Sequence, residues 1–113
     1  MHELSLAQGI VELIEEQARA QRFTKVRRVH LVVGALSHVM PEALEFGFVS
    51  AAKGTVAEGA EVVMTRPPGT ASCVGCEKNV TIERRGDPCP ECGSFQVLIT
   101  GGDELRVSDL DVE

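Results

Sequence analysis

The chain has 113 residues, enough for one main domain with a small appended module. Hydrophobic residues make up 43% of it but aromatic residues only 4%, with no Trp or Tyr, so the core has to be built mainly from Val, Leu, Ile and Ala. The formal net charge of −6 argues against binding to nucleic acid without regard to sequence, because neutralising phosphates requires clustered Lys and Arg.

Residues 4–20 have the pattern of an amphipathic helix, with apolar side chains at the spacing that places them on one face. These are Leu4, Ala7, Ile10, Val11, Ile14 and Ala18. Ser5 and Gln8 have the spacing of a capping box, which predicts a helix that starts at residue 5 or a little earlier. Three glutamates interrupt the apolar run and no basic segment precedes it, so we expect neither a signal peptide nor insertion into a membrane.

A strand and a second helix are predicted next. In residues 26–34 apolar side chains alternate with more polar ones, and His30 falls on the polar face, where we expect it to be partly exposed. Pro41 then opens a helix, because a proline at the first helical position loses no hydrogen bond. Met40 precedes it and has no side-chain acceptor, so the start of this helix should lack a side-chain cap.

The second half of the chain predicts three further strands around a cysteine-rich segment. The strands cover residues 60–66, 96–100 and 105–112, and a Gly-Gly-Asp turn separates the last two. The segment from about residue 70 to 95 lies between them and carries all four cysteines. The order of elements predicts an α+β fold in which a small mixed sheet is packed by two helices, with the cysteine segment inserted between sheet strands.

The four cysteines form two matched Cys-x-x-Cys pairs, Cys73 with Cys76 and Cys89 with Cys92. Two such turns about a dozen residues apart supply the four sulfur ligands of a tetrahedral Zn(II) site, as in a zinc ribbon. Four sulfurs leave no open coordination position, so the zinc is expected to be structural. The alternative is two disulfides or free thiols, but nothing in the sequence indicates an oxidising compartment, and we expect a cytoplasmic protein.

The N-terminus offers a second kind of metal site. The amine of Met1 and the backbone nitrogen of His2 close a five-membered chelate ring, and the His2 imidazole closes a six-membered ring with the same nitrogen. A backbone nitrogen or the carboxylate of Glu3 completes a nitrogen-rich, planar set that suits Ni(II) or Cu(II). Both the amine and the imidazole must lose protons to bind, so affinity should fall below neutral pH. The alternative is that His2 is an ordinary solvated terminal residue.

Motifs spread over the whole chain occur in the same order in one known family. They are Met1–Ala7, Gly34–Ser37, Pro41–Leu44, Gly54–Gly59, the four cysteines, and Ile99–Leu105. The chain thereby resembles the HypA/HybF family, whose members deliver nickel during maturation of [NiFe]-hydrogenase. Some members of the family also serve urease.

The resemblance implies a division into an α+β nickel-binding domain, residues 1–69 plus 96–113, and a zinc-ribbon domain, residues 70–95. It implies structural Zn(II) on the four cysteines and transiently bound Ni(II) on His2, the Met1 amine and Glu3. It also implies a metallochaperone rather than an enzyme, with two partners: the accessory GTPase HypB, and the precursor of the hydrogenase large subunit that receives the nickel.

One position departs from the family. Relatives usually carry an acidic residue just before the second helix, where this chain has Met40, and His38 is a candidate replacement if it is not simply an exposed loop residue. The alternative function is a zinc-ribbon module that docks on proteins without delivering nickel. An enzyme is not indicated, because the chain lacks a glycine-rich phosphate loop and a paired nucleophile and base.

Overall fold

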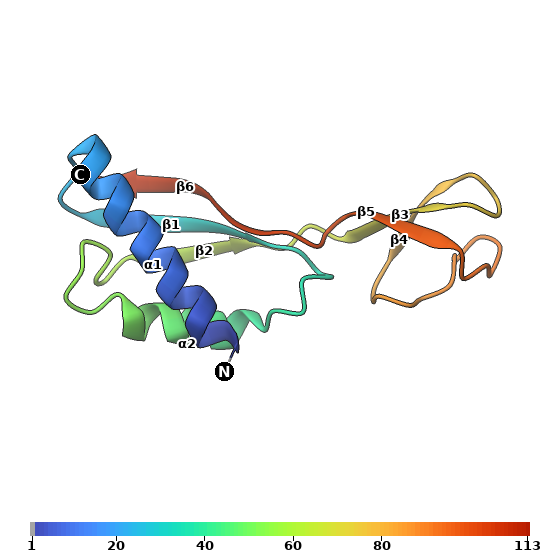
Figure 1. Cartoon of the computed structure of the whole chain (residues 1–113), viewed down its shortest axis with the longest axis horizontal. Helices are drawn as coiled ribbons and strands as arrows, with labels where there is room; N and C mark the ends of the chain where they lie inside the picture. The colour runs from blue at the N-terminus through green and yellow to red at the C-terminus, as the bar shows by residue number, and fades with distance from the viewer. Residues whose placement is uncertain (1) are drawn as a thin grey trace. The chain divides into compact units, whose positions relative to one another are not determined.

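The computed structural model of the chain describes residues 2–113, so the predicted ligand Met1 lies outside the described residues. The elements, in chain order, are α1 (His2–Gln21), β1 (Val26–Val33), α2 (Pro41–Ala51), β2 (Glu61–Thr65), β3 (Gly69–Cys73), β4 (Asn79–Ile82), β5 (Val97–Gly101) and β6 (Leu105–Val112) (Figure 1). The strands form two three-stranded sheets, in the orders β2-β1-β6 and β4-β3-β5. The predicted α+β class is confirmed.

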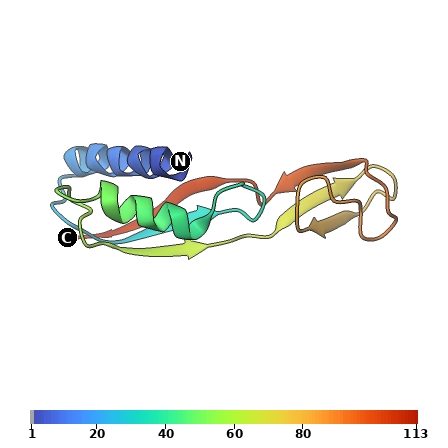
Figure 2. The ribbon, with the colours of Figure 1, turned by 90° about the horizontal axis from the view of Figure 1, so that it is seen from below.

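The first sheet carries both helices on one face. β1 and β2 run in the same direction and β6 runs against them, so this sheet is mixed (Figure 2). α1 and α2 pack closely against each other at Gly47: a Cβ there would lie 3.4 Å from both the Cα of Leu4 and the Cβ of Ala7, which is van der Waals contact. The core beneath the helices is built from aliphatic side chains and Phe48, as the composition predicts. Its most buried members include Ile14, Val26, Val29, Leu31, Leu44 and Phe48.

The opposite face of β1 is charged and ordered by ion pairs. Arg28 donates from Nη1 to Asp111 over 3.1 Å and from Nε to Glu61 over 3.2 Å, and the Nε2 atom of His30 lies 3.1 Å from the same Asp111 carboxylate. The hydrogen bonds from His30 and Arg28 hold the pKa of Asp111 below its usual range. His30 is half-buried, as predicted, and this pairing gives it a structural role.

The first helix starts earlier than residue 5, and the predicted capping box is not formed. α1 begins at His2, so Ser5 lies inside the helix and makes no capping box. The reason is tertiary packing, which dominates helical stability: the first turn of α1 lies against α2 at Gly47, and burial there favours helix over the local cap. The start of α2 is as predicted, with Pro41 in its first turn and no hydrogen bond from the Met40 side chain. The consequence for function is that His2 and Glu3 belong to a helical turn.

The second sheet surrounds the cysteines. β3 is its central strand and pairs antiparallel with both β4 and β5, so that Ala71 faces Val80 on one side and Ile99 on the other. β5 therefore belongs to the sheet of the cysteine segment, whereas the sequence predicts residues 96–100 as a strand of the main layer. Val97 and Ile99 explain the choice, because they pack against the cluster of buried side chains there. That cluster consists of Leu36, Ala71, Cys73, Val80, Ile82 and Cys89.

Contacts between residues divide the chain into two compact units. One comprises residues up to Leu31, Val39–Met64 and Val107–Glu113, and the other comprises Val32–His38 and Thr65–Arg106. The sequence predicts other bounds, with one domain formed by residues 1–69 plus 96–113 and the other by residues 70–95. These domains differ from the two compact units and stay a prediction about which segments fold by themselves. Within residues 2–113 no helix is long and apolar enough to cross a membrane.

Two phenylalanines on α2 provide a direct test of this packing. Phe48 is 1% exposed and Phe46 is 79% exposed, although only one residue separates them. Truncating Phe48 to alanine leaves a cavity and should lower the free energy of unfolding by about 3–5 kcal/mol. The matched control, Phe46→Ala, should change it by less than about 0.5 kcal/mol. Urea unfolding of both variants, followed by circular dichroism, measures the difference; equal losses would contradict the orientation of α2.

Candidate metal sites

The two Cys-x-x-Cys segments fold into equivalent turns. The backbone N–H of Glu77 donates to the carbonyl of Cys73 over 2.9 Å, and that of Gly93 donates to the carbonyl of Cys89 over 2.8 Å. The residue that closes each turn has a left-handed backbone, with φ of 60° at Glu77 and 78° at Gly93. Glycine adopts this region without steric cost, which suits Gly93 to the end of the second turn.

Backbone N–H groups also point at the sulfurs. Cys76 donates to the Sγ of Cys73 and Glu91 to the Sγ of Cys89, each over 3.4 Å. Hydrogen bonds of this kind stabilise a thiolate, the form that binds metal. The turns therefore orient two sulfur atoms each and prepare them electrostatically as ligands.

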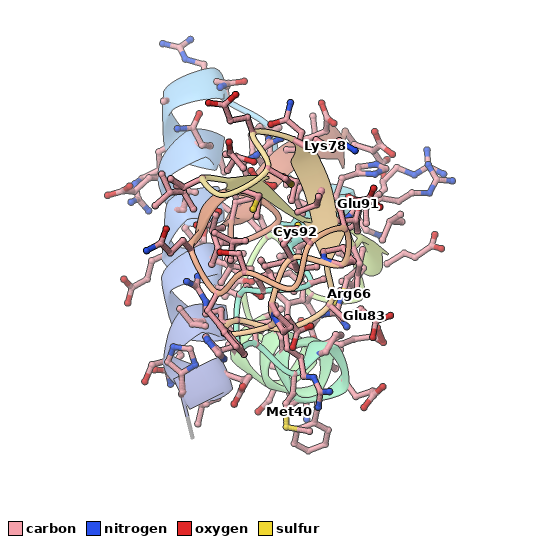
Figure 3. All side chains as sticks on the ribbon, turned by 90° about the vertical axis from the view of Figure 1, so that its right-hand side faces the viewer. Met40, Arg66, Lys78, Glu83, Glu91 and Cys92 are labelled. Atoms are coloured by element: carbon pink, nitrogen blue, oxygen red, sulfur yellow. The ribbon has the colours of Figure 1, made fainter. Side chains whose placement is uncertain are left out.

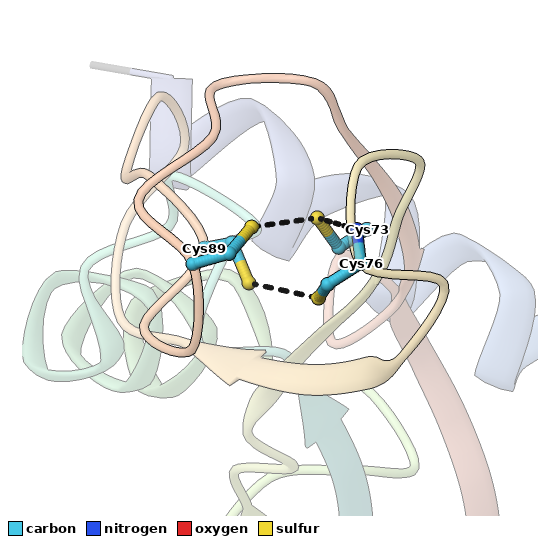
Figure 4. Close-up of side chains that lie close together, drawn as sticks. Cys73, Cys76 and Cys89 are labelled. Atoms are coloured by element: carbon cyan, nitrogen blue, oxygen red, sulfur yellow. Dashed lines mark hydrogen bonds between the residues drawn. The ribbon is translucent and has the colours of Figure 1, made fainter.

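The four sulfurs converge on one point (Figure 4). All four Sγ atoms lie within 4.8 Å of one another, with 3.6 Å between Cys73 and Cys92 and 3.7 Å between Cys76 and Cys89. These separations exclude disulfides, whose S–S bond is about 2.05 Å. They fit the edge of a tetrahedron with Zn–S bonds of about 2.3 Å, which is about 3.8 Å long. Cys73 and Cys89 are buried, whereas Cys92 is exposed on the surface of this unit (Figure 3).

The acidities of the thiols show why this cluster favours a cation. The N–H of Cys76 lowers the pKa of Cys73 to about 7. Burial, together with the neighbouring Cys73 thiol, raises the pKa of Cys76 to about 12. The N–H of Ser94 lowers the pKa of Cys92. The neighbouring Cys73 thiol and burial raise it by more, so the pKa of Cys92 lies above its usual value. Four neighbouring thiols cannot all ionise without a cation, because their negative charges repel one another. A bound metal takes the place of their protons.

The other predicted ligands lie in the first turn of α1. The His2 side chain is 63% exposed, and its Nδ1 atom is 4.0 Å from the Glu3 carboxylate, whose side chain is only 14% exposed. Imidazole and carboxylate are thus neighbours on the helix, with the imidazole open to solvent. The structure brings His2 and Glu3 together; Met1, the third predicted contributor, is outside the described residues.

The Glu3 carboxylate has a partner that the sequence did not indicate. It accepts the backbone N–H of Met40 over 3.2 Å, so it joins the first turn of α1 to the start of α2. This bond, followed by the bond from Glu3's own N–H, lowers the pKa of the Glu3 carboxyl group and keeps it ionised. No sequence signal could have found this contact, because the donor is a main-chain N–H that any residue at position 40, proline excepted, would offer.

His38, the candidate replacement ligand, belongs to the other compact unit. It is exposed, has a left-handed backbone with φ of 61°, and borders a hollow of about 280 Å³. Leu36 and Arg85 line the same hollow, and the Arg85 Nε donates to the carbonyl of Leu36 over 3.0 Å. Within residues 2–113, the cysteine quartet is the one group of three or more Cys, His, Asp or Glu side chains close enough to hold a metal ion.

Comparison with known proteins identifies the family. The family model described as "Hydrogenase/urease nickel incorporation, metallochaperone, hypA" matches residues 1–112. The chain belongs to the HypA family. Similar curated proteins are Hydrogenase maturation factor HypA 2 of Bradyrhizobium diazoefficiens and Hydrogenase maturation factor HypA of Azotobacter chroococcum mcd 1. Each is 50% identical to this chain over 113 residues, which is the full length of both chains.

Solved HypA structures have the same fold. The solution structure of the Ni metallochaperone HypA from Helicobacter pylori covers 97% of this chain and 96% of its own, with a TM-score of 0.70 and 23% identity. A second solution structure of a HypA protein covers 100% of this chain and 97% of its own, with a TM-score of 0.73 and 24% identity. The family model and the full-length relatives, not these structures, confirm the HypA family that the sequence motifs indicate; the described role of that family is that of a metallochaperone, not an enzyme.

Proposed function

We propose that this HypA chain binds Ni(II) at its N-terminus and delivers it to the precursor of the [NiFe]-hydrogenase large subunit, in the cytoplasm and with the GTPase HypB as partner. The observation that carries the proposal is the pairing of an exposed His2 imidazole with the ionised Glu3 carboxylate in the first turn of α1. An exposed site of this kind also suits a donor, because a partner's ligands can replace its own one at a time.

Helix geometry supports backbone ligation there. The first N–H groups of an α-helix have no carbonyl partner within the helix, so a metal that binds the nitrogens of His2 and Glu3 does not break the helical ladder. The positive end of the helix dipole opposes a cation, which weakens the site. The negative charge of Glu3 offsets part of this opposition. The balance favours moderate affinity, as transfer requires.

Structural Zn(II) on Cys73, Cys76, Cys89 and Cys92 is the second part of the proposal. Zinc is supported by the four-sulfur ligand set and by separations that fit its tetrahedral shell. When bound, zinc would cross-link the two turns. Its four sulfur ligands would leave no coordination position open for a substrate. The four cysteines hold it, and the turns that present them need no further rearrangement.

The test compares nickel binding by the untagged chain and by the same chain extended by two residues before Met1. Extension turns the terminal amine into an amide, and isothermal titration should show an affinity for Ni(II) lower by about tenfold or more. Zinc content, measured by elemental analysis, should be equal in both forms and serves as the control. Equal nickel affinity in the two forms would rule out the N-terminal amine as a ligand.

A further inference from the structure

The outward face of α2 exposes apolar side chains that the fold does not use. Phe46 is 79% exposed, Val49 is 52% exposed, and Met40, just before the helix, is 61% exposed. Met40 lies at the periphery of the molecule in Figure 3. Phe95, in the other compact unit, is 75% exposed as well, so exposure of a single phenylalanine does not by itself mark α2. Three exposed apolar side chains gathered on and beside one helix are costly to leave in water and are typical of an interaction surface.

This face is hollowed as well as apolar. A groove of about 370 Å³ runs between α2 and β2, lined by Pro41, Phe46, Val49, Met64 and two glutamates. β2 is an edge strand of its sheet, so this side of the molecule is open to a partner. The volume is enough for one or two large side chains, and an exposed aromatic residue beside such a groove is typical of a binding hot spot.

The acidic side chains that line the groove indicate the charge of the segment that would bind there. Glu42 and Glu45 are the charged side chains that line the groove, and both are exposed. They lie three residues apart on the helix and so share one face with Phe46 and Val49. A segment that fills the groove with apolar side chains must therefore place its flanking residues against two carboxylates, which favours Lys or Arg there.

The same argument excludes a second copy of this chain. A symmetric dimer built on this face would bring the same patch of both copies together and so place four carboxylates, Glu42 and Glu45 of each copy, in one interface, with no basic side chain among the described residues that line the groove. The chain also carries a net charge of −6, which adds repulsion between copies at longer range. A cationic partner avoids both costs.

We propose that the α2 groove, defined by Pro41, Glu42, Glu45, Phe46, Val49 and Met64, docks a cationic amphipathic segment of a partner protein. Apolar side chains of that segment enter the groove beside Phe46, and its Lys or Arg side chains pair with Glu42 and Glu45. The docking concerns a helix face and not the metal ligands, so it goes beyond the proposed function and does not require nickel at the N-terminus.

The partner segment is identified first. The full chain with Phe46→p-benzoylphenylalanine is expressed in cells that need hydrogenase maturation, irradiated, and its cross-linked peptides are sequenced by mass spectrometry. Leu98→p-benzoylphenylalanine, at an exposed apolar position of the other unit, is the matched control. We expect position 46, and not position 98, to cross-link to a segment with net positive charge. A neutral or acidic segment, a second copy of this chain, or no cross-link specific to position 46 would overturn the proposal.

A synthetic copy of that segment then tests the chemistry, by fluorescence anisotropy with the zinc-loaded, nickel-free chain. Phe46→Ser should weaken binding by about tenfold or more, as truncation of a hot-spot residue does. Glu42→Lys with Glu45→Lys should weaken it by a similar factor and reduce its dependence on salt. Controls are Leu98→Ser and Glu12→Lys with Glu16→Lys, which reverse two exposed charges on α1; these should bind within about threefold of the parent.

Melting temperatures separate loss of docking from loss of fold. Phe46, Glu42 and Glu45 are exposed, so their variants should melt within about 3 °C of the parent chain. Folded variants that bind the peptide as tightly as the parent would overturn the proposal. If instead docking is lost while nickel affinity is unchanged, the docking surface is supported separately from the N-terminal nickel site.

Discussion

Replacing Cys73 by serine is expected to unfold the segment 69–101 while α1 and α2 stay folded. The side chains of Cys73 and Cys89 are buried in a small cluster that also contains Leu36 and Ile82, so a metal bound by the cysteines would cross-link the apolar core of this unit. Its strands have only four or five residues each. A unit of this size buries too little apolar surface to be stable alone, and we expect metal binding to supply the missing folding free energy.

Hydrogen exchange measured by mass spectrometry follows the two units separately. In Cys73→Ser, and in the parent chain after treatment with a strong chelator, amides of β3, β4 and β5 should lose their protection while those of α1 and β1 keep it. The matched control is Val74→Ser, which places a serine at an exposed position of the same turn and keeps all four ligands. A chelated chain with fully protected β3 would show that the metal is not structural; simultaneous loss of α1 would show that the units do not unfold separately.

Local signals in the sequence were sufficient for most elements. The spacing of apolar residues placed α1 and β1, and Pro41 with its missing N–H placed the start of α2. The cysteine spacing predicted a convergent quartet, because a Cys-x-x-Cys turn is a local structure with few possible geometries. The elements and the two turns share one cause, because each depends on side chains only a few residues apart. The convergence of the two turns, 13 to 19 residues apart, follows instead from the shared ligand geometry of a four-sulfur site.

Features that depend on contacts between distant residues could not be predicted from local sequence patterns. β5 has the alternation of a strand, but its choice of sheet depends on whether Val97 and Ile99 reach the cluster around Ala71 or the core under the helices. The helical first turn likewise depends on contact with Gly47. Strand pairing and helix packing are set by burial across the fold, which periodicity along one segment does not encode.

The proposed nickel site includes such a distant contact, and this leads to an expected difference between two variants of Glu3. Its carboxylate is already committed to the N–H of Met40, so we expect Glu3 to bind nickel through its backbone nitrogen. Glu3→Gln retains a side-chain acceptor for the Met40 N–H and should keep the nickel affinity within about threefold of the parent. Glu3→Ala removes the hydrogen bond to the start of α2 and should weaken nickel binding by about tenfold. Similar, large losses in both variants would make the carboxylate itself the ligand.

The largest effect is expected at His2, whose loss removes an imidazole and a chelate ring. His2→Ala should weaken nickel binding by about a hundredfold or more, because nitrogen ligands dominate a planar Ni(II) site. Isothermal titration of untagged, zinc-loaded protein measures this. His30→Ala is the matched control, because His30 is engaged with Asp111 on β6 and should not bind nickel. His38→Ala tests the loop histidine: unchanged affinity is expected, and a loss as large as that of His2→Ala would add His38 to the ligand set.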